Sequence, residues 1–228
     1  RRQRQMCIRD RYYNPTGADI GFDGEVLNED KLALTKCKNA QLLIDLVNCD
    51  RGICPTQWQK QQIPSEFHNK IEVLHDGIDT GYFLPNPDAV LKIPNSNLQL
   101  TYNDEVVTYA TRGMEPYRGF PQFMEMAEKL LKKRPNVHIV IAGEDRICYG
   151  AKLAKGSYKQ IMLDKLDLDM SRVHFTGSLP YGEYKKLLQI SSAHVYLTYP
   201  FVLSWSMLEA MSCGCCIVAV SYTHLMLP

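Results

Sequence analysis

The chain lacks the features of a membrane, secreted or strongly charged protein. No run approaches the ~20 consecutive apolar residues that a membrane-spanning helix needs, and residues 1–11 lack the apolar stretch of a secretory signal. The 26 basic and 25 acidic residues give a formal net charge of +1, which argues against an electrostatic grip on nucleic acid. We therefore expect a cytoplasmic protein with no transmembrane segment and no nucleic-acid partner.

The chain also has little that suggests a disulfide framework or a metal site. Its eight cysteines are a small fraction of 228 residues, and we expect them to be reduced thiols. Three of them flank Gly214 in the segment 213–216, but no Cys or His pair elsewhere has zinc-finger spacing. Small buried residues at a helix-to-strand turn are the simpler interpretation. Three histidines begin or enter predicted strands and are expected to be structural: His138, His174 and His194.

Between residues 105 and 219 the apolar pattern alternates between strands and helices. Segments such as His138–Ala142 are apolar on both faces, which is typical of parallel strands covered on two sides. Five such strands separated by helices predict a doubly wound α/β domain with a parallel sheet. Pro135 ends the first helix. That helix carries one apolar stripe at steps of three and four, formed by Phe120, Phe123, Met124, Ala127, Leu130 and Leu131.

The domain organisation follows from where these patterns change. Residues 12–85 read as the C-terminal part of an earlier α/β domain, and residues 104–220 as an incomplete second α/β domain. Residues 86–103 are rich in proline and asparagine, which breaks both periodicities and predicts an interdomain linker. Residues 1–11 and 221–228 fit neither pattern. We expect them to be non-native ends of a chain truncated on both sides.

Ligands of doubly wound sheets bind outside the carboxyl ends of the strands, and the loop 111–119 is the first such strand-to-helix turn. It matches neither the dinucleotide glycine motif nor a Walker loop. Arg112 ends the strand, and Arg118 stands just before a helix N-terminus, whose partial charge disfavours a cation. A diphosphate between the two guanidiniums would resolve this conflict. The alternative is a solvated Arg118 and an Arg112 that pairs with Glu115.

The second informative turn is Tyr199–Ala210. Leu203 and Ser204 could offer backbone N–H groups to a phosphate, and Glu209 could accept both hydroxyl groups of a ribose. The alternative is a capping box, in which Glu209 only reaches back to the Ser206 N–H. The local pattern by itself favours the capping box slightly.

The third turn follows the strand that ends near Gly177. This glycine allows the backbone to approach a flat group closely, and Pro180 begins the next helix. A nucleobase could stack here, or the turn could be an ordinary strand exit.

Five segments occur in one order along the chain and together resemble a known family. They are IEVLHDGIDTGYFLP, TRGMEPYRGFPQFME, HIVIAGE, VHFTGSLPYGEY and YPFVLSWSMLEAMSCGCCIVA. They are similar to segments of the family 4, or group 1, glycosyltransferases, which are retaining nucleotide-sugar enzymes with the two-Rossmann GT-B fold. The resemblance covers roughly residues 12–220.

The resemblance implies which residues hold a nucleotide-sugar donor. Arg112 and Arg118 correspond to the family's basic pair on the donor diphosphate, with Arg118 in place of the more usual lysine. Glu209 corresponds to the glutamate that grips the donor ribose. The other implied contacts are Gly113, Leu203 and Ser204 with the diphosphate or sugar, and Gly177 and Leu179 with the base.

One position departs from the family pattern. The family usually carries a second glutamate eight positions before Glu209, and this chain has Phe201 there. Either the donor sugar is held differently, or that hydroxyl contact is absent. The resemblance also implies that the acceptor pocket and the catalytic histidine lie upstream of this chain, so no catalytic residue is assigned and the fragment alone is expected to be inactive.

The function implied by the resemblance is transfer of a sugar from a nucleoside diphosphate, with retention, to a glycan, lipid or small-molecule acceptor. Stabilisation of the departing diphosphate would drive the reaction, without a cofactor or metal, because two arginines and a helix N-terminus supply the positive charge. Two alternatives share the fold. One is a non-catalytic nucleotide- or phosphate-binding module, and the other is a GT-B sugar-nucleotide epimerase.

Overall fold

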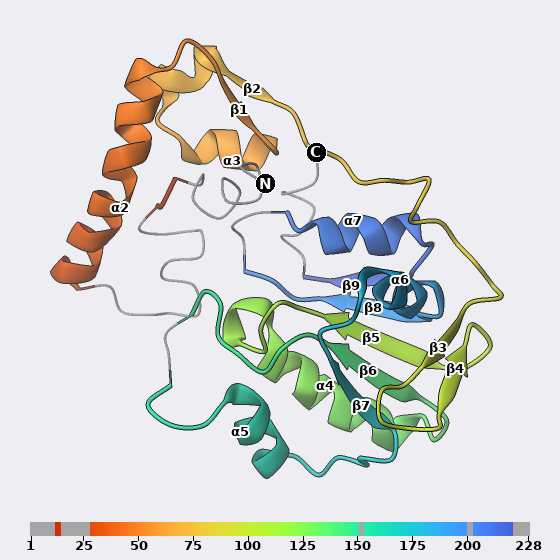
Figure 1. The fold of residues 1–228 in the computed structure, drawn as a ribbon. Helices are drawn as coiled ribbons and strands as arrows, with labels where there is room; N and C mark the ends of the chain where they lie inside the picture. Colours follow the sequence, from red (N-terminus) through yellow and green to blue (C-terminus); the bar gives the residue numbers. More distant parts are fainter. Residues whose placement is uncertain (1–11, 15–27, 151–152, 200–202, 221–228) are drawn as a thin grey trace. The chain divides into compact units, whose positions relative to one another are not determined.

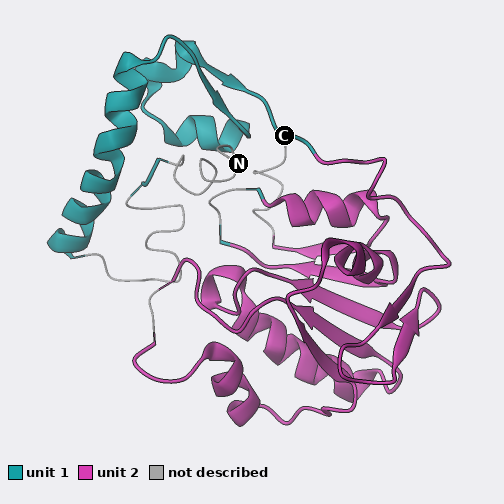
Figure 2. Cartoon of the chain, in the orientation of Figure 1, with its two compact units in different colours: residues 1–77, 199–203, 221–228 teal, residues 78–198, 204–220 magenta. Residues whose placement is uncertain are grey.

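A computed structural model describes residues 12–14, 28–150, 153–199 and 203–220. Phe201 and the two expected non-native ends lie outside these residues. The chain forms two compact units (Figure 2). The first contains residues 1–77, 199–203 and 221–228, and the second contains residues 78–198 and 204–220.

The first unit alternates helices and strands in a small α/β arrangement. Its elements are α2 (Glu29–Asn48), β1 (Gly52–Cys54), α3 (Gln57–Gln62), the 3-10 helix η2 (Ser65–Lys70) and β2 (Ile71–Val73). Strands β1 and β2 pair in parallel. The Asn28 side chain caps α2 by accepting a hydrogen bond of 2.9 Å from the Lys31 N–H. A small apolar core joins the helices to the strands, formed by Leu46, Cys54, Ile63 and Ile71.

The second unit is built on a five-stranded parallel sheet (Figure 1). Its strands are β5 (Val106–Ala110), β6 (His138–Ala142), β7 (Val173–Gly177), β8 (Ala193–Tyr196) and β9 (Ile217–Ala219). They lie in the order β7-β6-β5-β8-β9. The connections contain η3 (Pro116–Arg118), α4 (Phe120–Lys133), α5 (Tyr158–Lys165), α6 (Tyr181–Gln189) and α7 (Trp205–Ser212). The predicted doubly wound α/β domain is confirmed.

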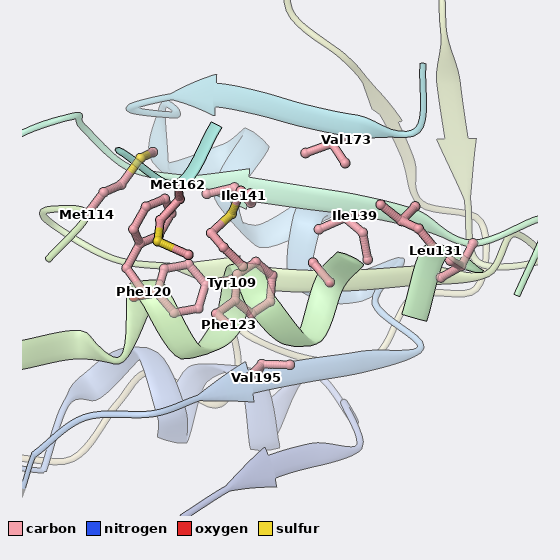
Figure 3. Packing of buried hydrophobic residues seen from close by; sticks show 13 residues of the cluster. Tyr109, Met114, Phe120, Phe123, Leu131, Ile139, Ile141, Met162, Val173 and Val195 are labelled. Atoms are coloured by element: carbon pink, nitrogen blue, oxygen red, sulfur yellow. The ribbon is translucent and has the colours of Figure 1, made fainter. Parts of the chain in front are cut away.

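One face of this sheet packs against α4 and α5. Alternate strand residues point to this face, among them Tyr109, Ile139 and Ile141, and they contact the apolar stripe of α4 (Figure 3). Five of the six predicted stripe residues are buried, and Leu130 packs at the edge of the same cluster. The ring of Phe123 stacks on that of Tyr109 with 4.5 Å between centroids. The apolar residues of α4, spaced three and four apart, therefore pack against alternate residues of the strands.

The opposite face packs against α6 and a hairpin formed by β3 (Val90–Lys92) and β4 (Gln99–Thr101). Leu91 and Leu100 lie in this core with 0% and 1% of their surface exposed. The predicted linker 86–103 therefore contains regular structure that its proline and asparagine content did not indicate. Strands of three residues each are too short to show a periodicity in the sequence. A connecting role of this segment between domains stays a prediction.

The histidines of the second unit have structural partners. His194 is fully buried, and its Nδ1 lies 2.8 Å from the Thr108 hydroxyl. Burial lowers the pKa of His194 to about 4, so the ring is neutral at physiological pH. His138 and His174 form a ring-to-ring hydrogen bond of 3.0 Å. The cysteines that the structure describes are all free thiols.

The part of the chain that the structure describes holds neither a membrane-spanning helix nor a cluster of metal-ligating side chains. Within residues 12–14, 28–150, 153–199 and 203–220, no helix is both long and apolar enough to cross a membrane. The same part of the chain contains no group of three His, Cys, Asp or Glu side chains that could hold a metal ion.

The packing of the hairpin leads to a stability prediction. Leu91→Ala is expected to lower the free energy of unfolding by about 2–5 kcal/mol, because it leaves a cavity between β3 and α6. Val90→Ala is the control, because Val90 is 41% exposed. Its truncation should lower the free energy of unfolding by less than about 1 kcal/mol. Urea unfolding followed by circular dichroism measures both variants. If both variants lost the same free energy of unfolding, the burial of Leu91 would not stabilise the core.

Candidate functional site

The candidate site is a cavity of about 520 Å³ in the second unit. It lies where β5, β6 and β8 end and where α6 and α7 begin. The carboxyl ends of parallel strands share one edge of a sheet, so the loops that leave them meet there. The lining residues used below are Arg112, Arg118, Arg146, Leu179, Tyr181, Tyr184, Tyr196, Ser204 and Glu209.

Arg118 follows β5 and precedes α4, as the sequence predicts. Its guanidinium donates a hydrogen bond of 3.1 Å to the Thr198 hydroxyl at the end of β8. The guanidinium carbon also lies 5.1 Å from the centroid of the Tyr149 ring. Both of these partners are uncharged, so they orient the guanidinium without neutralising it. Gly119, with φ of 68°, then begins α4 as its N-cap.

Arg112 lines the same cavity and its side chain is exposed. The alternative in which Arg112 pairs with Glu115 is wrong. The Glu115 carboxylate is fully buried and accepts hydrogen bonds of 2.8–3.2 Å from the backbone N–H groups of Cys148, Tyr149 and Gly150. The sequence did not indicate this contact because the loop 148–150 is some thirty residues away from Glu115.

Gly113, predicted to contact the diphosphate, is not among the residues that line the cavity. A Cβ atom there would come 2.5 Å from the Arg146 carbonyl oxygen and 2.9 Å from the Cys148 sulfur. The Arg146 guanidinium donates a hydrogen bond of 3.2 Å to the Arg112 carbonyl and forms a 2.9 Å ion pair with Glu144. The absence of a side chain at Gly113 therefore lets the loop after β6 pack closely against the loop that carries Arg112.

Among the described residues that line the cavity, Glu209 is the one that carries a carboxylate. The capping-box interpretation of Glu209 is wrong. Helix α7 begins at Trp205 with Ser204 as its N-cap, so Ser206 lies inside the helix. The Glu209 carboxylate accepts hydrogen bonds from the hydroxyl groups of Tyr181, at 3.2 Å, and Tyr184, at 3.0 Å. The carboxylate therefore faces α6 and the cavity.

Burial affects how readily the Glu209 carboxylate ionises. It raises the pKa of Glu209, and the hydrogen bonds from Tyr184 and Tyr181 partly offset the increase. Burial and the nearby carboxylate raise the pKa of Tyr181 to about 12, and they raise that of Tyr184 further. Both hydroxyl groups therefore stay protonated at neutral pH and act as donors to the carboxylate.

The turn after β7 contributes one of its two predicted residues to the cavity. Leu179 lines the cavity, and Gly177 adopts a left-handed conformation with φ of 67°. A Cβ atom at Gly177 would meet nothing within 4 Å, so the glycine is required for its backbone angle and leaves open space beside it. The Ser178 hydroxyl between them donates a 3.0 Å hydrogen bond to Glu144.

The turn before α7 also contributes one of its two predicted residues. Ser204 lines the cavity, and its backbone N–H donates a 3.2 Å hydrogen bond to the Tyr196 hydroxyl. Leu203 is buried, with 4% of its surface exposed. The phosphate contact predicted for these two amides stays a prediction. Phe201, in place of the expected glutamate, lies outside the described residues.

Several residues of the site were missed in the sequence. Tyr181 and Tyr184 are spaced as neighbours on one face of a helix that follows a strand end, which is a signal that could have found them. Arg146 follows β6 at the same edge of the sheet and could have been found in the same way. The role of Glu115 had no local signal.

Two family models match the chain. The model described as glycosyl transferases group 1 matches residues 96–226, which is more than half of the chain. The model described as glycosyl transferase family 4 group matches residues 4–83. A search of curated protein sequences gave no significant match.

Solved structures share the fold at low sequence identity. A sucrose-phosphate synthase from Thermosynechococcus elongatus aligns with a TM-score of 0.61 and 16% identity over 89% of this chain and 46% of that one. HepE from Anabaena, solved with UDP and glucose, aligns with a TM-score of 0.55 and 16% identity over 86% and 49%. A variant of S. aureus TarM, solved with fondaparinux, α-GlcNAc-glycerol and UDP, aligns with a TM-score of 0.55 and 21% identity over 85% and 34%.

The chain thus spans between 34% and 49% of the length of these three proteins. The structural likeness shows the α/β fold of the GT-B glycosyltransferases, including the Rossmann-like domain built on the five-stranded sheet. Together with the match over residues 96–226, it shows that the chain belongs to the group 1 glycosyltransferases.

Proposed function

We propose that this chain binds the donor of a retaining glycosyltransferase, which moves a sugar from a nucleoside diphosphate to an acceptor. The observation that carries the proposal is the shared cavity of Arg112, Arg118 and Glu209. Its volume of about 520 Å³ suits a nucleotide-sized ligand. One cavity thus combines cationic groups for a diphosphate with a carboxylate for ribose hydroxyl groups.

The electrostatics of the cavity favour a departing diphosphate. The Thr198 hydroxyl and the Tyr149 ring, both uncharged, orient the Arg118 guanidinium beside the cavity that it lines. Charge that is fixed in place before the reaction stabilises a leaving group without the cost of reorganisation. In this proposal Arg112, Arg118 and the start of α4 meet the charge of the diphosphate, and the nucleotide sugar is the substrate with no cofactor beside it.

The arrangement around Glu209 suits a ribose. An ionised carboxylate has about four acceptor positions, and the two tyrosine hydroxyl groups use two of them. The remaining positions can accept hydrogen bonds from neighbouring ribose hydroxyl groups, while the tyrosines hold the carboxylate in one orientation. We propose that Leu179 and the open space beside Gly177 then receive the base.

The acceptor is a glycan, a lipid or a small molecule in this proposal, and the chain alone is expected to bind donor without transferring sugar. Incubation of the chain with a radiolabelled nucleotide sugar and model acceptors tests this, and sugar transfer would contradict it. Donor binding by a full-length homologous enzyme without transfer or hydrolysis would favour a non-catalytic module, and an isomerised donor would indicate an epimerase.

Removal of the Arg118 charge tests the diphosphate site. Arg118→Ala is expected to weaken binding of a nucleoside diphosphate by ~1 to 3 kcal/mol, because charge-assisted hydrogen bonds are lost, and to leave the neutral nucleoside unaffected. Titration calorimetry with UDP, GDP and ADP, each beside its nucleoside, measures the difference. Arg134→Ala is the control, because that arginine pairs with Glu105 on the surface. Equal losses of affinity for the nucleotide and the nucleoside would show that Arg118 only supports the fold.

The raised pKa of Glu209 leads to a pH-dependent prediction. The folded state binds this proton more tightly than the unfolded state, so ionisation of Glu209 destabilises the fold as pH rises above the ordinary value of 4.5. Glu209→Gln removes this ionisation. The melting temperature of the variant relative to the parent should therefore be higher at about pH 8 than at about pH 4.

The same variant should lose ribose recognition. Glu209→Gln is expected to reduce the preference for UDP over 2′-deoxy-UDP, because hydrogen bonds to a charged acceptor contribute about 1.5–3 kcal/mol. Glu183, a half-buried residue of α6 that pairs with Lys186 and does not line the cavity, supplies the control variant Glu183→Gln. Calorimetry measures both affinities. If the preference for UDP over 2′-deoxy-UDP does not change, Glu209 does not contact the ribose.

A further inference from the structure

Glu115 is a fully buried carboxylate that has no part in the donor contacts described above. Its Oε1 accepts hydrogen bonds from the N–H groups of Cys148 at 3.1 Å and Tyr149 at 3.2 Å. Its Oε2 accepts from Tyr149 at 3.0 Å and Gly150 at 2.8 Å. A buried carboxylate is costly unless such donors satisfy it. Three consecutive backbone amides converge on this side chain, so Glu115 determines the conformation of the loop 148–150.

The packing around these hydrogen bonds leaves the loop little freedom. A Cβ atom at Gly150 would come 3.2 Å from the Glu115 Oε2, and one at Gly113 would come 2.9 Å from the Cys148 sulfur. Both contacts are closer than ordinary van der Waals separation. The loop 148–150 is therefore held against the loop that carries Arg112 and Arg118.

The loop holds the Tyr149 ring against Arg118, which lines the candidate diphosphate site. The ring centroid lies 5.1 Å from the guanidinium carbon of Arg118 and 5.9 Å from the Tyr117 ring centroid, at an interplanar angle of 33°. Thr198 accepts a hydrogen bond from the same guanidinium at 3.1 Å. A cation held by an aromatic face and a hydroxyl group keeps its charge and loses its rotational freedom.

We propose that Glu115 and Tyr149 are positioning residues for Arg118. Glu115 holds the loop 148–150 through three amides, the loop holds the Tyr149 ring, and the ring holds the Arg118 guanidinium in the orientation that receives a diphosphate. The inference rests on the proposed function of Arg118 as a diphosphate ligand. It adds a source of donor affinity in two residues that do not touch the donor.

A double-mutant cycle on Tyr149 and Arg118 tests the proposal with the 228-residue chain and UDP as the probe. Tyr149→Ala is expected to weaken UDP binding about 3- to 30-fold, the range of a cation–π contact, and uridine binding less than about 2-fold. Tyr149→Phe keeps the ring and should stay within about 2-fold of the parent for both ligands. In the Arg118→Ala background, Tyr149→Ala should have no further effect on UDP binding.

Glu115→Gln tests whether Glu115 holds the loop 148–150 in place. The substituted amide offers one acceptor oxygen in place of two and points N–H donors at the loop amides, so the loop should shift and UDP binding should weaken about 5- to 10-fold. Uridine binding should change less than about 2-fold, since a positioning role acts through the diphosphate. If this variant does not fold, the Tyr149 variants still decide the proposal. Tyr102→Ala, at a 57% exposed tyrosine of the second unit, is the control.

The outcomes separate this inference from the proposed function. Loss of UDP affinity in Arg118→Ala, together with unchanged affinity in Tyr149→Ala and Glu115→Gln, overturns the inference alone. Unchanged UDP affinity in Arg118→Ala overturns the proposed diphosphate site and the inference with it. Equal weakening for UDP and uridine in Tyr149→Ala or Glu115→Gln would show that the substituted residue only supports the fold. Additive effects in the cycle would show the same for Tyr149.

Discussion

The order of the parallel strands is the constraint on which the rest of the second unit depends. The chain leaves β5 toward β6 and β7 on one side, and returns to β8 and β9 on the other. The loops that follow β5 and β8 therefore diverge from neighbouring strand ends and leave a crevice between them. The candidate cavity lies at this point, and its cationic residues come from the loops after β5 and β6 while its carboxylate comes from α7.

Close backbone approach at this edge of the sheet depends on two glycines. A Cβ atom at Gly119 would come 2.5 Å from the Leu197 carbonyl oxygen, and one at Gly143 would overlap the Thr111 carbonyl oxygen. Both residues have positive φ, at 68° and 134°. Any side chain at either position would push the loops apart, so these glycines keep the strand ends close enough for one cavity to collect groups from three loops.

The charged groups of the site are held by partners that differ in kind. Glu209 is buried and receives hydroxyl donors, whereas Glu115 is buried more deeply and receives only backbone amides. Arg118 is held by a hydroxyl group and an aromatic face. These partners are uncharged, and the lining of the cavity brings Arg112 and Arg118 together with the Glu209 carboxylate. Under the proposed function, such a site would receive a ligand that carries both phosphate and sugar.

Apolar periodicity and local boundary residues were enough to predict the alternation of helices and strands, the apolar stripe of α4 and the strand-to-helix segments that carry Arg112, Arg118 and Glu209. These features repeat with a fixed local period or adjoin a local boundary. The partner of each polar group, in contrast, depends on how distant segments pack together. Glu115 accepts hydrogen bonds from amides of another loop and not from Arg112, and Glu209 accepts them from tyrosines of another helix. Within the proline-rich segment 86–103, Leu91 and Leu100 anchor a hairpin in the core. Each of these contacts joins distant parts of the chain, where packing and the satisfaction of buried polar groups outweigh local preference.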